Sequence, residues 1–123
     1  MNIQERGIRE AAKAASLATG KYRVGSALLR KSQLVSVGWN TTKTHPKNPS
    51  PNSQHAEFSC LHGVRRQDMS SLQLFVVRLD SGDQFAMSKP CTDCQEFLRA
   101  AGLRRVVYSV APGVLGKMTL EKR

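Results

Sequence analysis

Two short motifs contain the residue types needed to activate a water molecule on a metal ion. They are His55-Ala56-Glu57 and Pro90-Cys91-Thr92-Asp93-Cys94. Zinc prefers imidazole nitrogen and thiolate sulfur, and three protein ligands leave one of its four positions open for water. His55, Cys91 and Cys94 supply such a ligand set. Glu57 is an additional carboxylate that can carry a proton, so the pattern favours a catalytic zinc site over a structural one.

Two predicted helices position these motifs. The Pro-rich segment 40–53 is expected to be a loop, and Asn52 or Ser53 can cap a helix that runs from about His55 to Arg66. A second helix is expected over 91–101, after Pro90, with Gly102 closing it. Both motifs then lie at helix N-termini, where the helix dipole favours the thiolate form that binds metal.

The remaining pattern predicts a mixed sheet. An amphipathic helix is expected over residues 3–19 with Gly20 as its C-cap. The predicted strands cover 24–29 and 34–39, which form a hairpin, then the strongly apolar 72–79, and finally 105–110 and 114–120. Strand, helix and strand in succession predict parallel pairing of 72–79 with 105–110. We therefore expect an α/β fold of three layers, with a mixed five-stranded sheet and helices on both faces.

Length and composition place limits on the class of protein. The chain has 123 residues, 40% of them hydrophobic, which predicts a single domain over 1–123. The sequence contains neither a signal peptide nor an apolar run of membrane-spanning length, so we expect a soluble, cytoplasmic protein. Three cysteines, two of them in a Cys-x-x-Cys pair, predict metal or redox chemistry more than a disulfide framework.

The net charge is +10, and the acidic residues are distributed unevenly along the chain. No acidic residue occurs between Glu10 and Glu57, while seven Lys and Arg residues do: Lys13, Lys21, Arg23, Arg30, Lys31, Lys43 and Lys47. Such a field attracts nucleic acid or the phosphate of a single nucleotide. A solvated basic surface is the alternative explanation.

The two motifs together resemble the zinc-dependent cytidine and deoxycytidylate deaminase superfamily, whose pattern is His-x-Glu followed by Pro-Cys-x-x-Cys. The resemblance extends over roughly residues 3–110, because the order of predicted elements also matches. It implies that His55, Cys91 and Cys94 bind Zn²⁺ and that Glu57 is the catalytic proton carrier. The implied reaction is hydrolytic deamination of cytosine to uracil.

The resemblance also implies substrate contacts. Asn40 matches the position where family members hydrogen-bond the sugar, and the backbone around Ala56 and Ser88 would read the base edge. Tyr108 resembles an aromatic residue that packs near the base, and His45 borders the expected pocket. The simpler alternatives are a turn-capping role for Asn40, a packing role for Tyr108 and a solvated loop position for His45.

The expected substrate is cytosine in a phosphate-bearing nucleotide, as in a minimal deoxycytidylate or cytidine deaminase. Cytosine in single-stranded DNA is the second candidate, because the basic first half can form a strand path. Adenosine in tRNA is the third, and a zinc-containing nucleic-acid-binding module is the non-enzymatic alternative. We expect no membrane partner, and self-association into a dimer or tetramer, because related compact deaminases complete their pockets with neighbouring subunits.

Overall fold

A computed structural model describes residues 2–18, 23–40 and 69–120. In chain order, the elements are α1 (Ile3–Leu17), β1 (Arg23–Arg30), β2 (Gln33–Trp39), the 3₁₀ turn η1 (Met69–Ser71), β3 (Leu72–Leu79), β4 (Phe85–Ala86), α3 (Thr92–Ala101), β5 (Arg105–Ala111) and β6 (Val114–Thr119). These elements alternate between helix and sheet, which confirms the predicted α/β class.

The strands form one mixed sheet in the order β2-β1-β3-β5-β6, and the short β4 pairs with β3 outside this path. β1 pairs antiparallel with both β2 and β3, and β5 pairs antiparallel with β6. The central pair, β3 and β5, is parallel, as the intervening helix α3 requires. The sheet therefore has the predicted five strands and, in addition, the two-residue β4, whose Ala86 and Phe85 pair with the end of β3.

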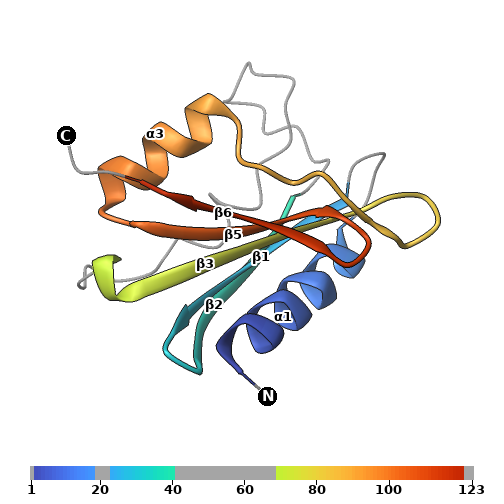
Figure 1. Ribbon diagram of the computed structural model, residues 1–123, viewed down its shortest axis with the longest axis horizontal. Coiled ribbons are helices and arrows are strands. Elements are labelled where there is room, and N and C mark those ends of the chain that lie inside the picture. Colours follow the sequence, from blue (N-terminus) through green and yellow to red (C-terminus); the bar gives the residue numbers. More distant parts are fainter. Residues whose placement is uncertain (1, 19–22, 41–68, 121–123) are drawn as a thin grey trace, which may run out of the picture.

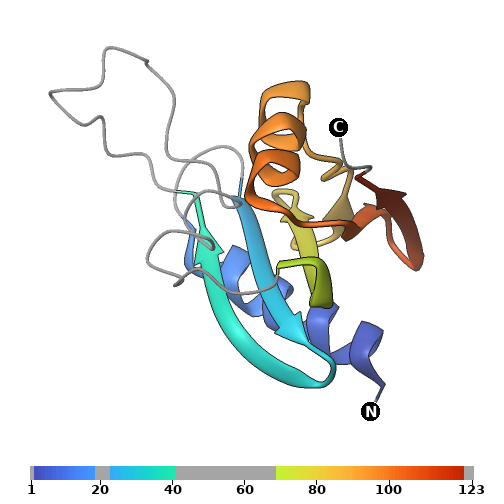
Figure 2. The ribbon, with the colours of Figure 1, turned by 90° about the vertical axis from the view of Figure 1, so that its left-hand side faces the viewer.

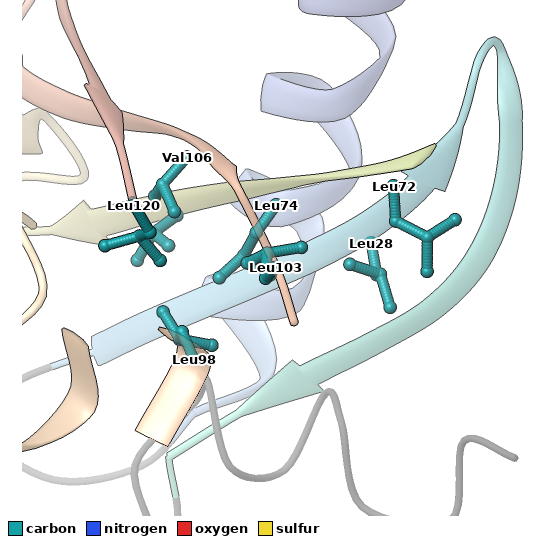
Figure 3. Close-up of a cluster of buried hydrophobic side chains, with 8 residues drawn as sticks. Leu28, Leu72, Leu74, Leu98, Leu103, Val106 and Leu120 are labelled. Carbon is teal, nitrogen blue, oxygen red and sulfur yellow. The ribbon is translucent and has the colours of Figure 1, made fainter. Parts of the chain in front are cut away.

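The two described helices cover opposite faces of the sheet, and this confirms the predicted layers. Figure 1 shows α3 above the strands and α1 below them, and Figure 2 shows β3 between the β1–β2 hairpin and the β5–β6 hairpin. Alternate residues of β3 point to the two faces, so the strand is buried on both. On the α3 face the core residues are Leu28, Leu72, Leu74, Val76, Leu98, Leu103, Val106 and Leu120 (Figure 3).

Helix α1 lies unusually close to the sheet because glycine occupies the contact on both sides. A Cβ atom added at Gly25 of β1 would overlap the backbone of α1 at Ala11 and Ala15. A Cβ atom added at Gly7 of α1 would overlap the ring of Phe75 on β3. Ala11 and Ala15 are themselves fully buried, so small residues build this side of the core.

Helix α1 ends earlier than the sequence predicts. Its C-cap is Ala18, whose backbone is extended and whose N–H donates to the Ala15 carbonyl at 3.1 Å, whereas we expected the helix to continue to residue 19 with Gly20 as its cap. The helix ends before the glycine is reached, because the backbone of Ala18 is extended (ψ 147°) and its N–H bonds to the carbonyl three residues back instead of four. The other helix end agrees with its prediction, since Gly102 adopts the left-handed conformation (φ 98°) that closes α3.

Among the residues described, no helix is long and apolar enough to cross a membrane.

Candidate functional site

The described residues among those expected to bind metal or substrate lie toward one edge of the sheet. This edge contains the carboxyl ends of the parallel strands β3 and β5, which are in register with Val76 opposite Tyr108. β1 begins and β2 ends at the same edge, because Val24 of β1 is the partner of Arg78 on β3. The carboxyl edge of parallel strands is where α/β proteins form their binding sites.

The two cysteines lie at the N-terminus of α3. Cys91 is the N-cap residue with an extended backbone, and its side chain makes no capping hydrogen bond. Cys94 is one turn further and buried, whereas Cys91 is exposed. Neither thiol is held in a disulfide. Because residues three apart share a helix face, two thiolates at this N-terminus fit two positions of a tetrahedral zinc site.

A buried pair of hydroxyl groups fixes the segment before the cysteines. The Ser88 N–H donates to the Ser109 carbonyl at 2.8 Å, and the Ser109 N–H donates to Ser88 Oγ at 2.8 Å. Ser88 Oγ also lies 2.9 Å from the Val76 carbonyl, and Ser109 Oγ lies 2.7 Å from the Ala86 carbonyl. These bonds connect the chain after β4 to both central strands. Because the Ser88 N–H donates to the Ser109 carbonyl, it is not available to hydrogen-bond the base. The expected backbone contact with the base edge would come from other backbone atoms near Ser88.

A second contact holds the same segment from the helix. The Gln95 side chain donates from Nε2 to the Pro90 carbonyl at 2.8 Å, and the Gln95 N–H donates to the Cys91 carbonyl at 2.9 Å. Sequence reasoning did not identify Ser109 or Gln95. A signal was present for Ser109, because it is a hydroxyl residue within the otherwise apolar segment Val106–Val110, and such a residue must find partners when buried.

Asn40 is buried at the end of β2, where it binds the start of β1. Its Oδ1 accepts from the Val24 N–H at 2.8 Å, and its own N–H donates to the Val24 carbonyl at 3.1 Å. The alternation of β1 and the packing of Val24 place this contact on the α3 face of the sheet. Asn40 therefore closes the β1–β2 pair at the edge of the site, which is a structural role beside the predicted sugar contact.

Tyr108 lies inside β5, which continues to Ala111, and packs against the apolar cluster on the α3 face. Its ring covers the backbone of Gly116 on β6, where an added Cβ atom would overlap the ring. The residue is half-buried. Tyr108 therefore contributes to the packing between α3 and β6, on the same sheet face as the cysteines.

Two cationic residues border this edge. Arg78, at the carboxyl end of β3, is two residues after Val76 and so lies on the same face as α3. Lys89 is exposed and lies two residues before Cys91. The sequence alone does not single out Arg78, because its face becomes apparent only from the register of β3.

The first metal-binding motif, His55-Ala56-Glu57, lies outside the described residues, as does His45. Within residues 2–18, 23–40 and 69–120, no group of three or more His, Cys, Asp and Glu side chains is placed to hold a metal ion. The described structure therefore contributes two of the three expected ligands, Cys91 and Cys94.

Comparison of the sequence with known families gives one extensive match. The profile of the cytidine and deoxycytidylate deaminase zinc-binding region matches residues 1–110. The chain belongs to the cytidine and deoxycytidylate deaminase family. A member of this family is a hydrolytic deaminase of cytosine-type substrates, and the name of the matched region indicates Zn²⁺ as the metal. No curated protein matches the chain.

Solved structures of deaminases share the fold. The cytidine deaminase from Burkholderia pseudomallei is 21% identical with a TM-score of 0.70, and the match covers 92% of this chain and 89% of that one. The dCMP deaminase from the cyanophage S-TIM5 is 21% identical with a TM-score of 0.66, covering 86% and 81%. The cytidine deaminase from Mycobacterium tuberculosis is 22% identical with a TM-score of 0.55, covering 88% and 87%. At these identities the likeness establishes the deaminase fold.

Proposed function

We propose that this deaminase is zinc-dependent and converts cytosine to uracil in a phosphate-bearing substrate such as dCMP. The observation that carries the proposal is the position of Cys91 and Cys94 at the N-terminus of α3, on the carboxyl edge of the parallel strands. With His55 they complete the His-Cys-Cys ligand set of the sequence motifs. Zinc in such a site supplies an activated water.

The proposal assigns proton transfer and substrate binding to different residues of the chain. Glu57 takes a proton from the water and delivers it to the ring nitrogen, so that the oxygen can attack the carbon bearing the amine. Glu57 then carries the second proton from the attacking oxygen to the amine, so that the carbon–nitrogen bond breaks and ammonia leaves. Asn40, Ser88, Tyr108, Ala56 and His45 are the proposed substrate contacts. Asn40, Ser88 and Tyr108 all lie toward this edge of the sheet, which supports the proposal that they border one site.

The proposed binding of a substrate phosphate rests on the positively charged side chains at this edge. Arg78 and Lys89 place two positive side chains at the carboxyl edge. The described acidic residues at this edge are Asp93 on the α3 N-terminal turn and Asp80 and Asp83 in the turn after β3, and Asp83 pairs with Arg23. The fold relatives include a cytidine deaminase and a dCMP deaminase solved in complex with dCMP and dUMP. The positions of Arg78 and Lys89 are therefore the support for a nucleotide over a free nucleoside.

The test is deamination of dCMP, deoxycytidine and a cytosine-containing single strand by the zinc-loaded protein, measured side by side as uracil formed. We expect dCMP to give the highest kcat/KM and Glu57→Gln to abolish activity. A single strand as the preferred substrate, with activity that falls steeply as salt increases, would instead support the strand-binding alternative. Failure of wild type to release ammonia from any of the three would contradict the proposal and leave the non-enzymatic zinc module.

Self-association into a dimer or tetramer is part of the same proposal. Sedimentation of the purified protein at micromolar concentration tests it, and a monomer alone under these conditions would contradict it.

A further inference from the structure

We propose that Ser88, Ser109 and Gln95 are positioning residues for the metal ligands: they hold the segment Ser88–Cys91 so that Cys91 and Cys94 are set for zinc before the metal arrives. This inference rests on the proposed function, because it assigns a task to residues around its metal site. None of the three side chains is expected to touch metal or substrate, because the substrate contact proposed at Ser88 is made by the backbone around it.

The burial pattern shows that the segment is anchored at Ser88. Met87 and Lys89 are exposed, whereas Ser88 between them is 8% exposed and Ser109 is fully buried. A segment with no regular secondary structure has no ladder to hold it, so its position depends on individual bonds. Here the hydrogen bonds of the two hydroxyl groups take the place of the strand-to-strand backbone hydrogen bonds, which end with β4.

Each hydroxyl in the pair has several partners of good geometry. Ser88 Oγ accepts from the Ser109 N–H at 2.8 Å and has the carbonyls of Val76 and Ser109 at 2.9 and 3.1 Å as acceptors for its own proton. Ser109 Oγ accepts from the Arg78 N–H at 3.2 Å and has the Ala86 carbonyl at 2.7 Å. The two oxygens are 2.9 Å apart. Loss of either hydroxyl would leave a buried backbone group without its bond.

The connection from this pair to the ligands is short and stiff. Only Lys89 and Pro90 separate Ser88 from Cys91, and the proline ring restricts the backbone between them. On the other side, the bond from Gln95 Nε2 to the Pro90 carbonyl fixes the same peptide from within α3. Cys91 is therefore held between the sheet and the helix that also carries Cys94.

Residues that orient metal ligands have a measurable effect on affinity. Removal of such outer-shell contacts costs about 10- to 100-fold in metal affinity in other proteins. We expect Ser88→Ala and Gln95→Met each to raise the zinc dissociation constant about 10-fold, within the range for such contacts. We also expect changed visible spectra after loading with Co²⁺, whose bands report coordination geometry.

The measurement is competition for zinc between the folded protein and a chromophoric chelator, with urea unfolding of the zinc-free protein beside it. Ser88→Thr keeps the hydroxyl and is expected to restore affinity to near the wild-type value. Ser16→Ala is the matched control, because Ser16 Oγ also donates to a backbone carbonyl, that of Lys13 at 2.6 Å, but from exposed α1. It should leave zinc binding unchanged.

The outcomes separate positioning from simple stabilisation. A substitution that only destabilises the fold lowers the free energy of unfolding but does not change the zinc dissociation constant of the molecules that remain folded. If Ser88→Ala and Gln95→Met bind zinc within twofold of wild type, the inference is wrong. Gln95 is half-buried on a helix, so its variant is expected to fold even if a serine variant does not. If the wild-type protein itself does not bind zinc, the proposed zinc-dependent function is wrong, and the inference that rests on it is wrong with it.

Discussion

Gly25→Ala should destabilise the protein strongly, because helix α1 has no room for a methyl group at this position. The added Cβ would overlap the Ala15 nitrogen and the Ala11 carbonyl oxygen and lie 2.8 Å from the Ala14 carbonyl carbon. All three atoms belong to the helix backbone. They cannot rotate away as the end of a flexible side chain can, so the helix as a whole must move off the sheet.

The expected size of the effect follows from two opposing contributions. Overpacking of a core costs about 1–3 kcal/mol, and the upper end applies here because the contact is with backbone. Replacing Gly by Ala also restricts the unfolded chain, which returns about 0.4–1 kcal/mol. The net loss in the free energy of unfolding is therefore about 2 kcal/mol. For a domain of this size it corresponds to a fall in Tm of roughly 6–10 °C.

The assay is urea unfolding monitored by circular dichroism, with Gly82→Ala as the matched control. Gly82 lies in the exposed turn after β3, its φ is not in the left-handed region, and an added Cβ would be 3.5 Å from Asp80 Oδ1, an ordinary contact. This control should be as stable as wild type or slightly more so. If Gly25→Ala were equal to Gly82→Ala within about 0.5 kcal/mol, a difference typical of neutral surface changes, the close approach of α1 to β1 would be refuted.

Three further substitutions test other parts of the structure. Gly102→Ala should lower the free energy of unfolding by about 1 kcal/mol in thermal or urea denaturation, because the left-handed C-cap of α3 (φ 98°) is strained for any residue with a Cβ. An unchanged free energy of unfolding would contradict the left-handed conformation of this cap. Asn40→Ala should cost about 1 kcal/mol in the same measurement, since it leaves the partly buried Val24 N–H without its 2.8 Å bond. An equal cost for Asn40→Asp, which keeps the acceptor, would argue against that reason. Gly116→Ala should displace the Tyr108 ring. If this ring borders the substrate, KM for dCMP should rise several-fold with a smaller change in kcat, and an unchanged KM would restrict Tyr108 to packing.

The fold was predictable to the extent that local patterns determine it. The apolar run of β3 and the position of α3 between two strands predicted the parallel pair, and Gly102 predicted a helix end. The end of α1 was predicted wrongly, because Gly20 is a strong local signal but the backbone already becomes extended at Ala18. Close packing between distant segments has no local signature, and the contact between Gly25 and α1 became visible only in three dimensions.

The candidate site was predictable where chemistry depends on residue type and spacing. Cys91 and Cys94 lie at a helix N-terminus as expected. Their role as metal ligands and the substrate contacts of Asn40, Ser88 and Tyr108 stay predictions. The supporting residues were not predictable in the same way. Ser109 and Gln95 are ordinary residues whose role depends on which backbone groups the fold brings within hydrogen-bond distance. The predictions for His55, Ala56, Glu57 and His45 stay predictions, since these residues lie outside the described part of the chain.

The hydroxyl pair of Ser88 and Ser109 also has a consequence for how this edge of the protein opens. Two backbone amides, those of Ser88 and Ser109, donate to each other's residue across the boundary between this segment and β5. When the segment before Cys91 separates from the sheet, both bonds break in one event, whereas the bond from the Arg78 N–H to Ser109 Oγ joins β3 to β5 and stays intact. Hydrogen exchange should therefore report a single opening free energy for the Ser88 and Ser109 amides, and zinc bound to Cys91 should slow their exchange together.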